Sequence, residues 1–233
     1  MKASPFKVAK RYIKTSADVR RMGELLSSGE QDPYLIDRFA REYARNPVNE
    51  YDELVWELST EHARFFDAPF ALATKALMVK YAQKSTESLT ESVNILDRGL
   101  KGGETGWVMP GRLTDAQFSM FFSRADIKRK VLGVEGITFR LSYFCSSSGP
   151  ETDGESLRTR VDITAPGHPE DRRALEEIVA RVYSLFRRWE TERNDATASV
   201  RFEKGTSGGP EDWRKVFREL PGEMKKVVRA LQN

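Results

Sequence analysis

The stretch Gly136–Cys145, GITFRLSYFC, is the part of the sequence that decides the fold. Its alternate positions fall on two sides, with Ile137, Phe139, Leu141 and Tyr143 on one and Thr138, Arg140, Ser142 and Phe144 on the other. Successive side chains of a β-strand point to opposite faces, so this alternation predicts a strand.

Two further segments toward the C-terminus alternate in the same way, Leu157–Thr164 and Thr197–Lys204. The polar segment 146–156 predicts a long loop that joins the first two strands as an antiparallel hairpin. A helical pattern from Pro169 to about Glu190 separates the second and third strands. Strand, helix and strand in this order predict a βαβ crossover with parallel strands.

The last part of the chain is predicted to form two helices. The first spans Glu211–Leu220, and Pro221-Gly222 ends it because proline lacks the N–H that continues a helix. The second runs from there to about Leu231.

Before Gly133 the apolar residues recur at helical spacing. The segments 15–27, 34–45, 49–66, 70–81, 86–100 and 114–130 are predicted to be helices, with a loop over Gly102–Gly111. The fold predicted is therefore α+β, with an N-terminal bundle of about six helices followed by a small three-stranded mixed sheet and covering helices. Residues 1–132 form the mainly helical part and residues 133–233 the α/β part, in the order ββαβαα. One continuous core is the alternative, because no linker-like composition separates the two parts.

The composition is that of a soluble globular protein. Of 233 residues, 39% are hydrophobic and 31% are charged, and the single Cys145 excludes an intramolecular disulfide. The start of the chain lacks the apolar core of a signal peptide. The most apolar stretch, Ala68–Ala82, contains Pro69, Lys75 and Lys80 and is too short for a bilayer span. These features predict a cytoplasmic location and no membrane span.

Charge is distributed unevenly toward the N-terminus. Residues 1–21 carry seven basic side chains and one acidic one, whereas residues 29–67 carry ten acidic side chains and four arginines. This opposition favours internal pairing, head-to-tail association or contact with phosphate. The alternative is an ordinary set of solvated helix faces whose charges mix in space.

No segment carries a catalytic, metal or cofactor signature. Glu57 and Glu61 share a helix face near His62, but no second histidine stands at a ligand spacing. The loop serines at 146–148 lack a G-x-S-x-G elbow, and neither glycine-bearing loop, 99–106 or 205–210, matches a phosphate-binding motif. We therefore predict no catalytic residue, no metal and no cofactor.

Basic residues interleaved with aromatic ones suggest a nucleic-acid interface. The candidate residues are Lys7, Lys10, Arg11, Arg140 and Arg201. Single strands bind by stacking on exposed aromatic rings beside a basic groove. The same sheet aromatics are equally what a core packed against helices requires.

The function predicted first is that of a non-enzymatic interaction protein, an adaptor, a regulator or a self-assembling subunit that acts through charged and aromatic surfaces. Its partner is another protein or a second copy of the chain. Nucleic-acid binding is the alternative, and an enzyme built on the carboxylates of Glu57 and Glu61 is the second alternative.

Overall fold

The described part of the chain is built on one antiparallel sheet. The computed structural model describes residues 68–104, 106–113, 120–146, 155–167, 169–207 and 210–232. Six strands lie in the order β1-β2-β3-β4-β6-β5, and every neighbouring pair is antiparallel. Their bounds are β1 Trp107–Leu113, β2 Met120–Val131, β3 Val134–Ser146, β4 Glu155–Thr164, β5 Glu190–Asn194 and β6 Ser199–Ser207.

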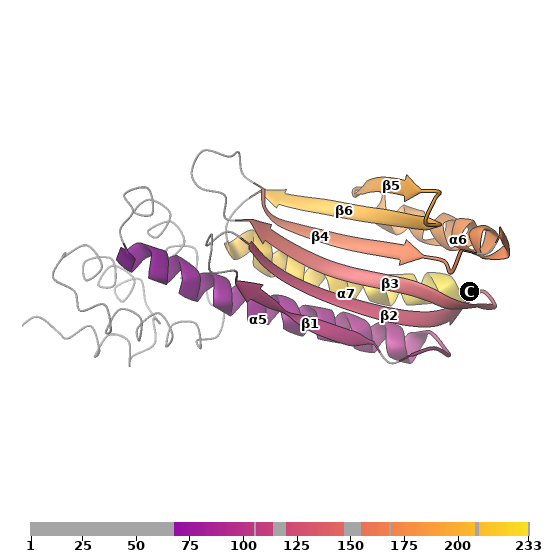
Figure 1. Ribbon diagram of the computed structural model, residues 1–233, viewed down its shortest axis with the longest axis horizontal. Helices are drawn as coiled ribbons and strands as arrows, with labels where there is room; N and C mark the ends of the chain where they lie inside the picture. Colours follow the sequence, from indigo (N-terminus) through magenta and orange to yellow (C-terminus); the bar gives the residue numbers. More distant parts are fainter. Residues whose placement is uncertain are drawn as a thin grey trace, which may run out of the picture.

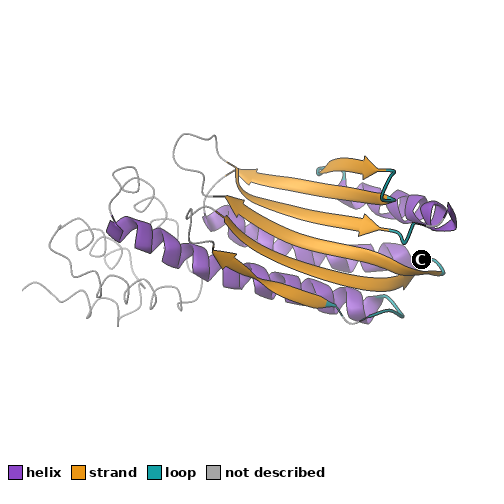
Figure 2. Ribbon diagram, viewed as in Figure 1, coloured by secondary structure: helices purple, strands orange, loops and turns teal. Residues whose placement is uncertain are grey.

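The helices of the described part all cover the same face of this sheet (Figures 1 and 2). They are α5 Ala68–Gly99, α6 Pro169–Val182 and α7 Pro210–Gln232, and a short 3-10 helix, Tyr183–Phe186, follows α6. Among the described residues, no helix combines the length and the apolar content that crossing a membrane requires. We call the sheet face toward these helices the inner face and the opposite one the outer face.

The hydrophobic core fills the space between the inner face and the helices. The rings of Tyr81, Tyr143, Trp213 and Phe217 meet there, with Tyr143 and Phe217 edge to face at a centroid separation of 5.0 Å. Aromatic rings prefer this arrangement because the positive edge of one meets the negative face of the other. At the β6 side, Phe186 stacks on Phe202 at 4.5 Å.

One charged pair is placed in this interior. Arg129 on the inner face of β2 is 5% exposed and pairs with Asp97 of α5. Its guanidinium also donates hydrogen bonds to the backbone carbonyls of Glu104 and Lys128. Burial lowers the pKa of Arg129, and these partners compensate the charge that burial would otherwise leave unsolvated.

The described part combines helices with a sheet, but the arrangement predicted for it is wrong. A six-helix bundle followed by a three-stranded sheet is replaced by three α-helices and a six-stranded antiparallel sheet. The predicted loop at 102–111 contains most of β1, and the predicted helix at 114–130 contains most of β2. The two predicted helices at 70–81 and 86–100 are one helix, α5. Those predicted at 15–27, 34–45 and 49–66 lie outside the described residues.

The strands predicted at Gly136–Cys145 and Leu157–Thr164 are confirmed as β3 and β4, and their antiparallel pairing is confirmed too. The third predicted strand corresponds to β6, but its parallel pairing with β4 is wrong. Along the chain, the exposed strand β5 comes after α6 and before β6, and a turn over 195–198 reverses the chain direction between the two strands. Because of that reversal, β6 runs antiparallel to both of its neighbours.

The predicted break at Pro221-Gly222 is also wrong, because α7 continues through both residues. A proline within a helix cannot donate to the carbonyl four residues earlier, here that of Phe217. The hydroxyl of Ser88 on α5 donates to this carbonyl at 2.7 Å instead. A side chain from the neighbouring helix thus satisfies the acceptor that Pro221 leaves open.

The predicted boundary at 132/133 lies in the turn Leu132-Gly133, which joins β2 to β3. The division of the chain into two domains stays a prediction.

Candidate macromolecule-binding surface

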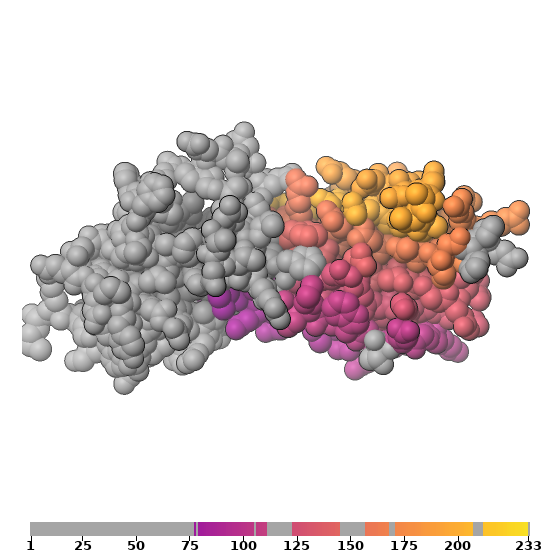
Figure 3. Space-filling model, in the orientation of Figure 1, coloured from indigo at the N-terminus to yellow at the C-terminus, as the bar shows by residue number. Residues whose placement is uncertain are grey.

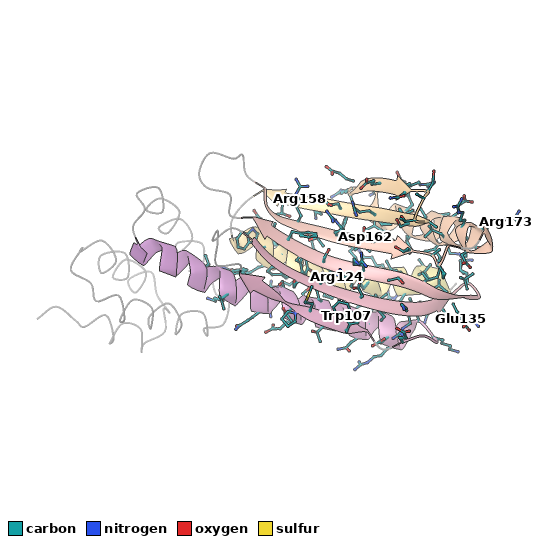
Figure 4. The ribbon with its side chains drawn as sticks, in the orientation of Figure 1. Trp107, Arg124, Glu135, Arg158, Asp162 and Arg173 are labelled. Atoms are coloured by element: carbon teal, nitrogen blue, oxygen red, sulfur yellow. The ribbon has the colours of Figure 1, made fainter. Side chains whose placement is uncertain are left out.

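The outer face of the sheet gathers charged side chains from neighbouring strands. None of the described helices covers this face (Figure 1). The alternation that buries one side of each strand directs the other side outward. Trp107, Arg124, Arg158 and Asp162 are labelled on this face in Figure 4, and Figure 3 shows the same side of the molecule.

Five of the outward residues form a row across the sheet, which we call the first charged row. It consists of Asp126, Arg140, Asp162, Arg201 and Glu192, each paired in register with the next. Carboxylate and guanidinium alternate along it. Arg140 donates to Asp126 at 2.8 Å, and Arg201 donates to Asp162 and to Glu192, each at 2.8 Å.

A second charged row lies beside the first. It consists of Arg124, Ser142, Arg160, Glu203 and Glu190, again paired in register. Arg160 donates to Glu203 at 2.8 Å, and Arg158 donates to the same carboxylate at 2.9 Å. Glu203 and Glu190 are like charges in opposite positions, which destabilises a sheet, and the two arginines offset this repulsion.

The ionisation of the rows follows from these contacts. Burial opposes the ionised form of Glu203, but the hydrogen bonds from Arg160 and Arg158 outweigh it, and the pKa of Glu203 is lowered. The hydrogen bond to Asp162 raises the pKa of Arg201. Both groups are therefore charged at neutral pH, and the rows carry fixed charges of both signs.

The balance of positive and negative side chains differs between the two sides of the outer face. Asp126 is shared by Arg124 and Arg140, and Glu203 is shared by Arg158 and Arg160. Toward the β5 edge, by contrast, one arginine is shared by two carboxylates, because Arg201 pairs with both Asp162 and Glu192. Guanidinium groups are thus in surplus over β2–β4, and carboxylates are in surplus at β5.

Two aromatic rings lie under arginines of the second charged row. The guanidinium of Arg124 lies 5.6 Å from the ring centre of Trp107, and that of Arg160 lies 4.6 Å from the ring centre of Phe144. A ring face attracts a cation, so each contact helps to fix its arginine. Trp107 itself is 50% exposed.

The structure brings together two of the predicted nucleic-acid residues and says nothing of the other three. Arg140 and Arg201 both belong to the first charged row, separated by Asp162. Lys7, Lys10 and Arg11 lie outside the described residues, as do Glu57, Glu61 and His62. The predicted nucleic-acid residues did not include Arg124, Arg158 or Arg160. The alternation of 157–164 contained the signal for the last two, because its apolar residues fix which side faces out.

Other features of the described part offer little chemistry. A cavity of about 140 Å³ lies between α6 and the β5–β6 turn, with Leu175, Val179 and Val200 in its wall. Arg172, Glu176, Arg193 and Asp195 also line it, so neither sign of charge dominates. Within the described ranges no three His, Cys, Asp or Glu side chains are grouped as metal ligands would be.

Comparison with known proteins identifies no relative, since no family model, no curated protein and no solved structure matches this chain.

Proposed function

We propose that this chain is a non-enzymatic protein that works by binding another macromolecule through the outer face of its sheet. The observation that carries the proposal is the pair of charged rows, aligned by strand register on a face that none of the described helices covers. Ion pairs and aromatic contacts already order these long side chains. Ordered side chains lose less conformational entropy when a partner binds, so such a face suits recognition.

A protein is the partner that fits the charge pattern best. The rows offer charges of both signs in fixed positions, and a protein surface also presents both signs. Complementary charges of this kind accelerate association and exclude wrong partners more than they add affinity. A polyanion would meet Asp126, Asp162 and Glu203 among the arginines, and repulsion from these carboxylates would oppose it.

Single-stranded nucleic acid is the second candidate, and the two aromatic contacts favour it. Trp107 beside Arg124 and Phe144 beside Arg160 offer rings next to cations on an open sheet. Such pairs are the elements by which proteins hold single strands. The enzyme alternative at Glu57 and Glu61 stays a prediction.

The proposal is tested by affinity capture from a lysate of the native cell. Three baits are compared: the wild-type chain, an outer-face variant with Arg140→Glu and Arg160→Glu, and a control with Arg173→Glu and Arg218→Glu. The control makes the same charge change on exposed positions of α6 and α7. We expect proteins that the wild type and the control retain and the outer-face variant loses. Equal retention by all three baits would refute the proposal.

The nucleic-acid candidate is tested with a short fluorescent oligothymidylate. Fluorescence anisotropy is recorded at increasing salt for the wild type and for Arg124→Glu. Phosphate contact releases counterions, so this candidate predicts affinity that falls steeply with salt and is weakened by the substitution. Absence of binding at low salt would dismiss it.

A further inference from the structure

The first charged row alternates in sign at every strand. It places a carboxylate on β2, a guanidinium on β3, a carboxylate on β4, a guanidinium on β6 and a carboxylate on β5. If two copies of this face meet across a two-fold axis parallel to the strands, the axis position decides which charges face each other. If the axis coincides with a strand, each charge of the row faces a like charge of the partner. If the axis lies midway between two strands, each charge faces an unlike charge.

An axis between β3 and β4, at the centre of the sheet, engages all six strands of both copies. It lays β3 over the partner's β4 and β2 over the partner's β6. Arg140 then faces the partner's Asp162, and Asp126 faces the partner's Arg201. Each contact occurs twice, because a two-fold interface is self-complementary.

The second charged row fits the same axis, although its sequence of charges is different. Arg124 on β2 faces the partner's Glu203 on β6. The partner's Arg160 on β4 lies over Ser142 of β3, which is buried and brings no charge to the interface. Glu190 and Glu192 on β5 face the uncharged Met109 and Trp107 of the partner's β1. Across this axis, no two like charges of the two rows face each other.

We propose that two copies of this chain associate through their outer faces, related by a two-fold axis that runs along the strands between β3 and β4. The inference names the partner of the proposed binding function and rests on it. The pairs within each copy are compatible with this dimer. A carboxylate has about four lone-pair sites, and Asp126 accepts three hydrogen bonds from Arg124 and Arg140, so one site is left for the partner's Arg201.

The size and the chemistry of the face predict a weak, salt-sensitive dimer. The six strands are 5 to 13 residues long and about 4.8 Å apart, which gives a footprint of about 700 Å² per copy. That is near the lower limit of about 1,200 Å² in total for specific interfaces. Removing charges from water also costs free energy that the new pairs partly recover. Packed sheets align within about 30°, so pairs near the axis contribute most, above all Arg140 with the partner's Asp162.

The test is sedimentation equilibrium on two variants, Arg140→Glu and Asp162→Arg, alone and mixed. Alone, each variant opposes two pairs of like charges across the axis. We expect its dimer dissociation constant to rise about a hundredfold, about tenfold for each contact.

Mixed in equal amounts, the two variants restore both contacts. The new carboxylate at position 140 of one copy faces the new guanidinium at position 162 of the other, and the native Asp162 and Arg140 face each other at the second contact. The mixture should therefore form a heterodimer. Arg218→Glu on α7 is the matched control and should dimerise like the wild type.

A second pair, Asp126→Arg with Arg201→Glu, probes the same axis one strand further out and serves if a variant of the first pair does not fold by circular dichroism. A wild type that stays monomeric at all accessible concentrations overturns the inference. So does dimerisation by either single variant with wild-type affinity, or a mixture that stays monomeric. If the wild type is monomeric while affinity capture still depends on the outer face, this inference fails and the proposed function stands.

Discussion

Ser88 is the residue on which the continuity of α7 depends. Its hydroxyl donates to the carbonyl of Phe217 at 2.7 Å, and it lies 3.0 Å from the hydroxyl of Tyr143. Because the Ser88 proton is used on the carbonyl, Tyr143 donates to Ser88. This buried chain of hydrogen bonds links β3, α5 and α7.

Ser88→Ala should lower the free energy of unfolding by about 2 kcal/mol or more, because it leaves the Phe217 carbonyl and the Tyr143 hydroxyl buried without a partner. Pro221→Ala supplies a backbone N–H to that carbonyl, so Ser88→Ala should cost about 1 kcal/mol less in its presence. Urea unfolding of both single variants and the double variant measures this coupling.

Ser92→Ala is the control for this cycle. Ser92 is equally buried on α5 but donates to the Ser88 carbonyl, which lies within the same helix. Its loss should cost less than Ser88→Ala. Additive effects of Ser88→Ala and Pro221→Ala would contradict the account of α7.

Glu203 should make stability depend on pH. Its folded-state pKa is lowered by Arg160 and Arg158 against the opposing effect of burial. A carboxyl with a lowered pKa stabilises the fold above its unfolded-state pKa, and this contribution is lost as the pH falls through the folded-state pKa.

We therefore expect wild type to be more stable than Glu203→Gln at neutral pH. The difference should shrink as the pH falls below the ordinary value of 4.5. Urea unfolding at a series of pH values measures it. Glu135→Gln, which removes an exposed pair with Lys130, is the control and should have little effect at any pH. A difference that grows on acidification would refute this role for Glu203.

At the scale of elements, two turns beside the C-terminal end of β2 have different steric demands. Gly103, between α5 and β1, has φ +111°, and a Cβ atom there would lie 2.2 Å from the backbone oxygen of Lys128. Gly133, between β2 and β3, has φ +84° and open space around it. Both positions favour glycine, but the first also lacks room for a side chain.

Gly133→Ala should cost about 1–2 kcal/mol, the usual strain of a left-handed residue. Gly103→Ala should cost clearly more, because the Lys128 backbone must move away from β1 or β3 to admit the methyl group. Thermal unfolding of the two variants compares them directly. Equal costs would mean that the α5–β1 turn is not packed against β2 as described.

The sequence allowed prediction of elements whose alternation is strong. β3, β4 and β6 place their apolar residues at every second position, and all three were predicted. β2 was not, because its apolar residues were interpreted at helical spacing and its outward positions 124, 126, 128 and 130 are all charged. In the structure this segment is a strand because its backbone pairs with β3 along most of its length. Pairing of this kind is non-local, so local spacing does not reveal it.

Two other errors have equally specific causes. β5 consists of exposed residues, ETERN, and therefore has no apolar alternation to recognise. It is held to the sheet by backbone pairing with β6. Pro221 predicts a helix break from local chemistry alone, whereas the compensating hydroxyl of Ser88 lies far away in the sequence.

At the scale of the whole molecule, the candidate surface follows from the strand order. Arg140 and Arg201 were selected from the sequence for their aromatic neighbours, yet each is paired with carboxylates that the antiparallel register brings beside it. The pattern within a single strand does not predict a row of residues that crosses five strands. The wrong parallel pairing of β4 with β6 would also have changed the register of that row.

In the proposed function the two faces of the sheet have different roles, the inner face in stability and the outer face in binding. α5, α6 and α7 bury the inner face, so most of the stability comes from the core, and the ion pairs of the charged rows add a smaller part. Substitutions on the outer face should therefore change binding more than folding. Binding through the outer face can therefore be tested in the folded protein.

The most direct test replaces Thr138, on the outer face of β3, with a photo-crosslinking amino acid and illuminates cells that express the full chain. The same amino acid at Arg218, on the exposed side of α7, provides the comparison. We expect a discrete crosslinked macromolecule, or a crosslinked dimer, from position 138 and none from position 218. Crosslinks from 218 with none from 138 would contradict it.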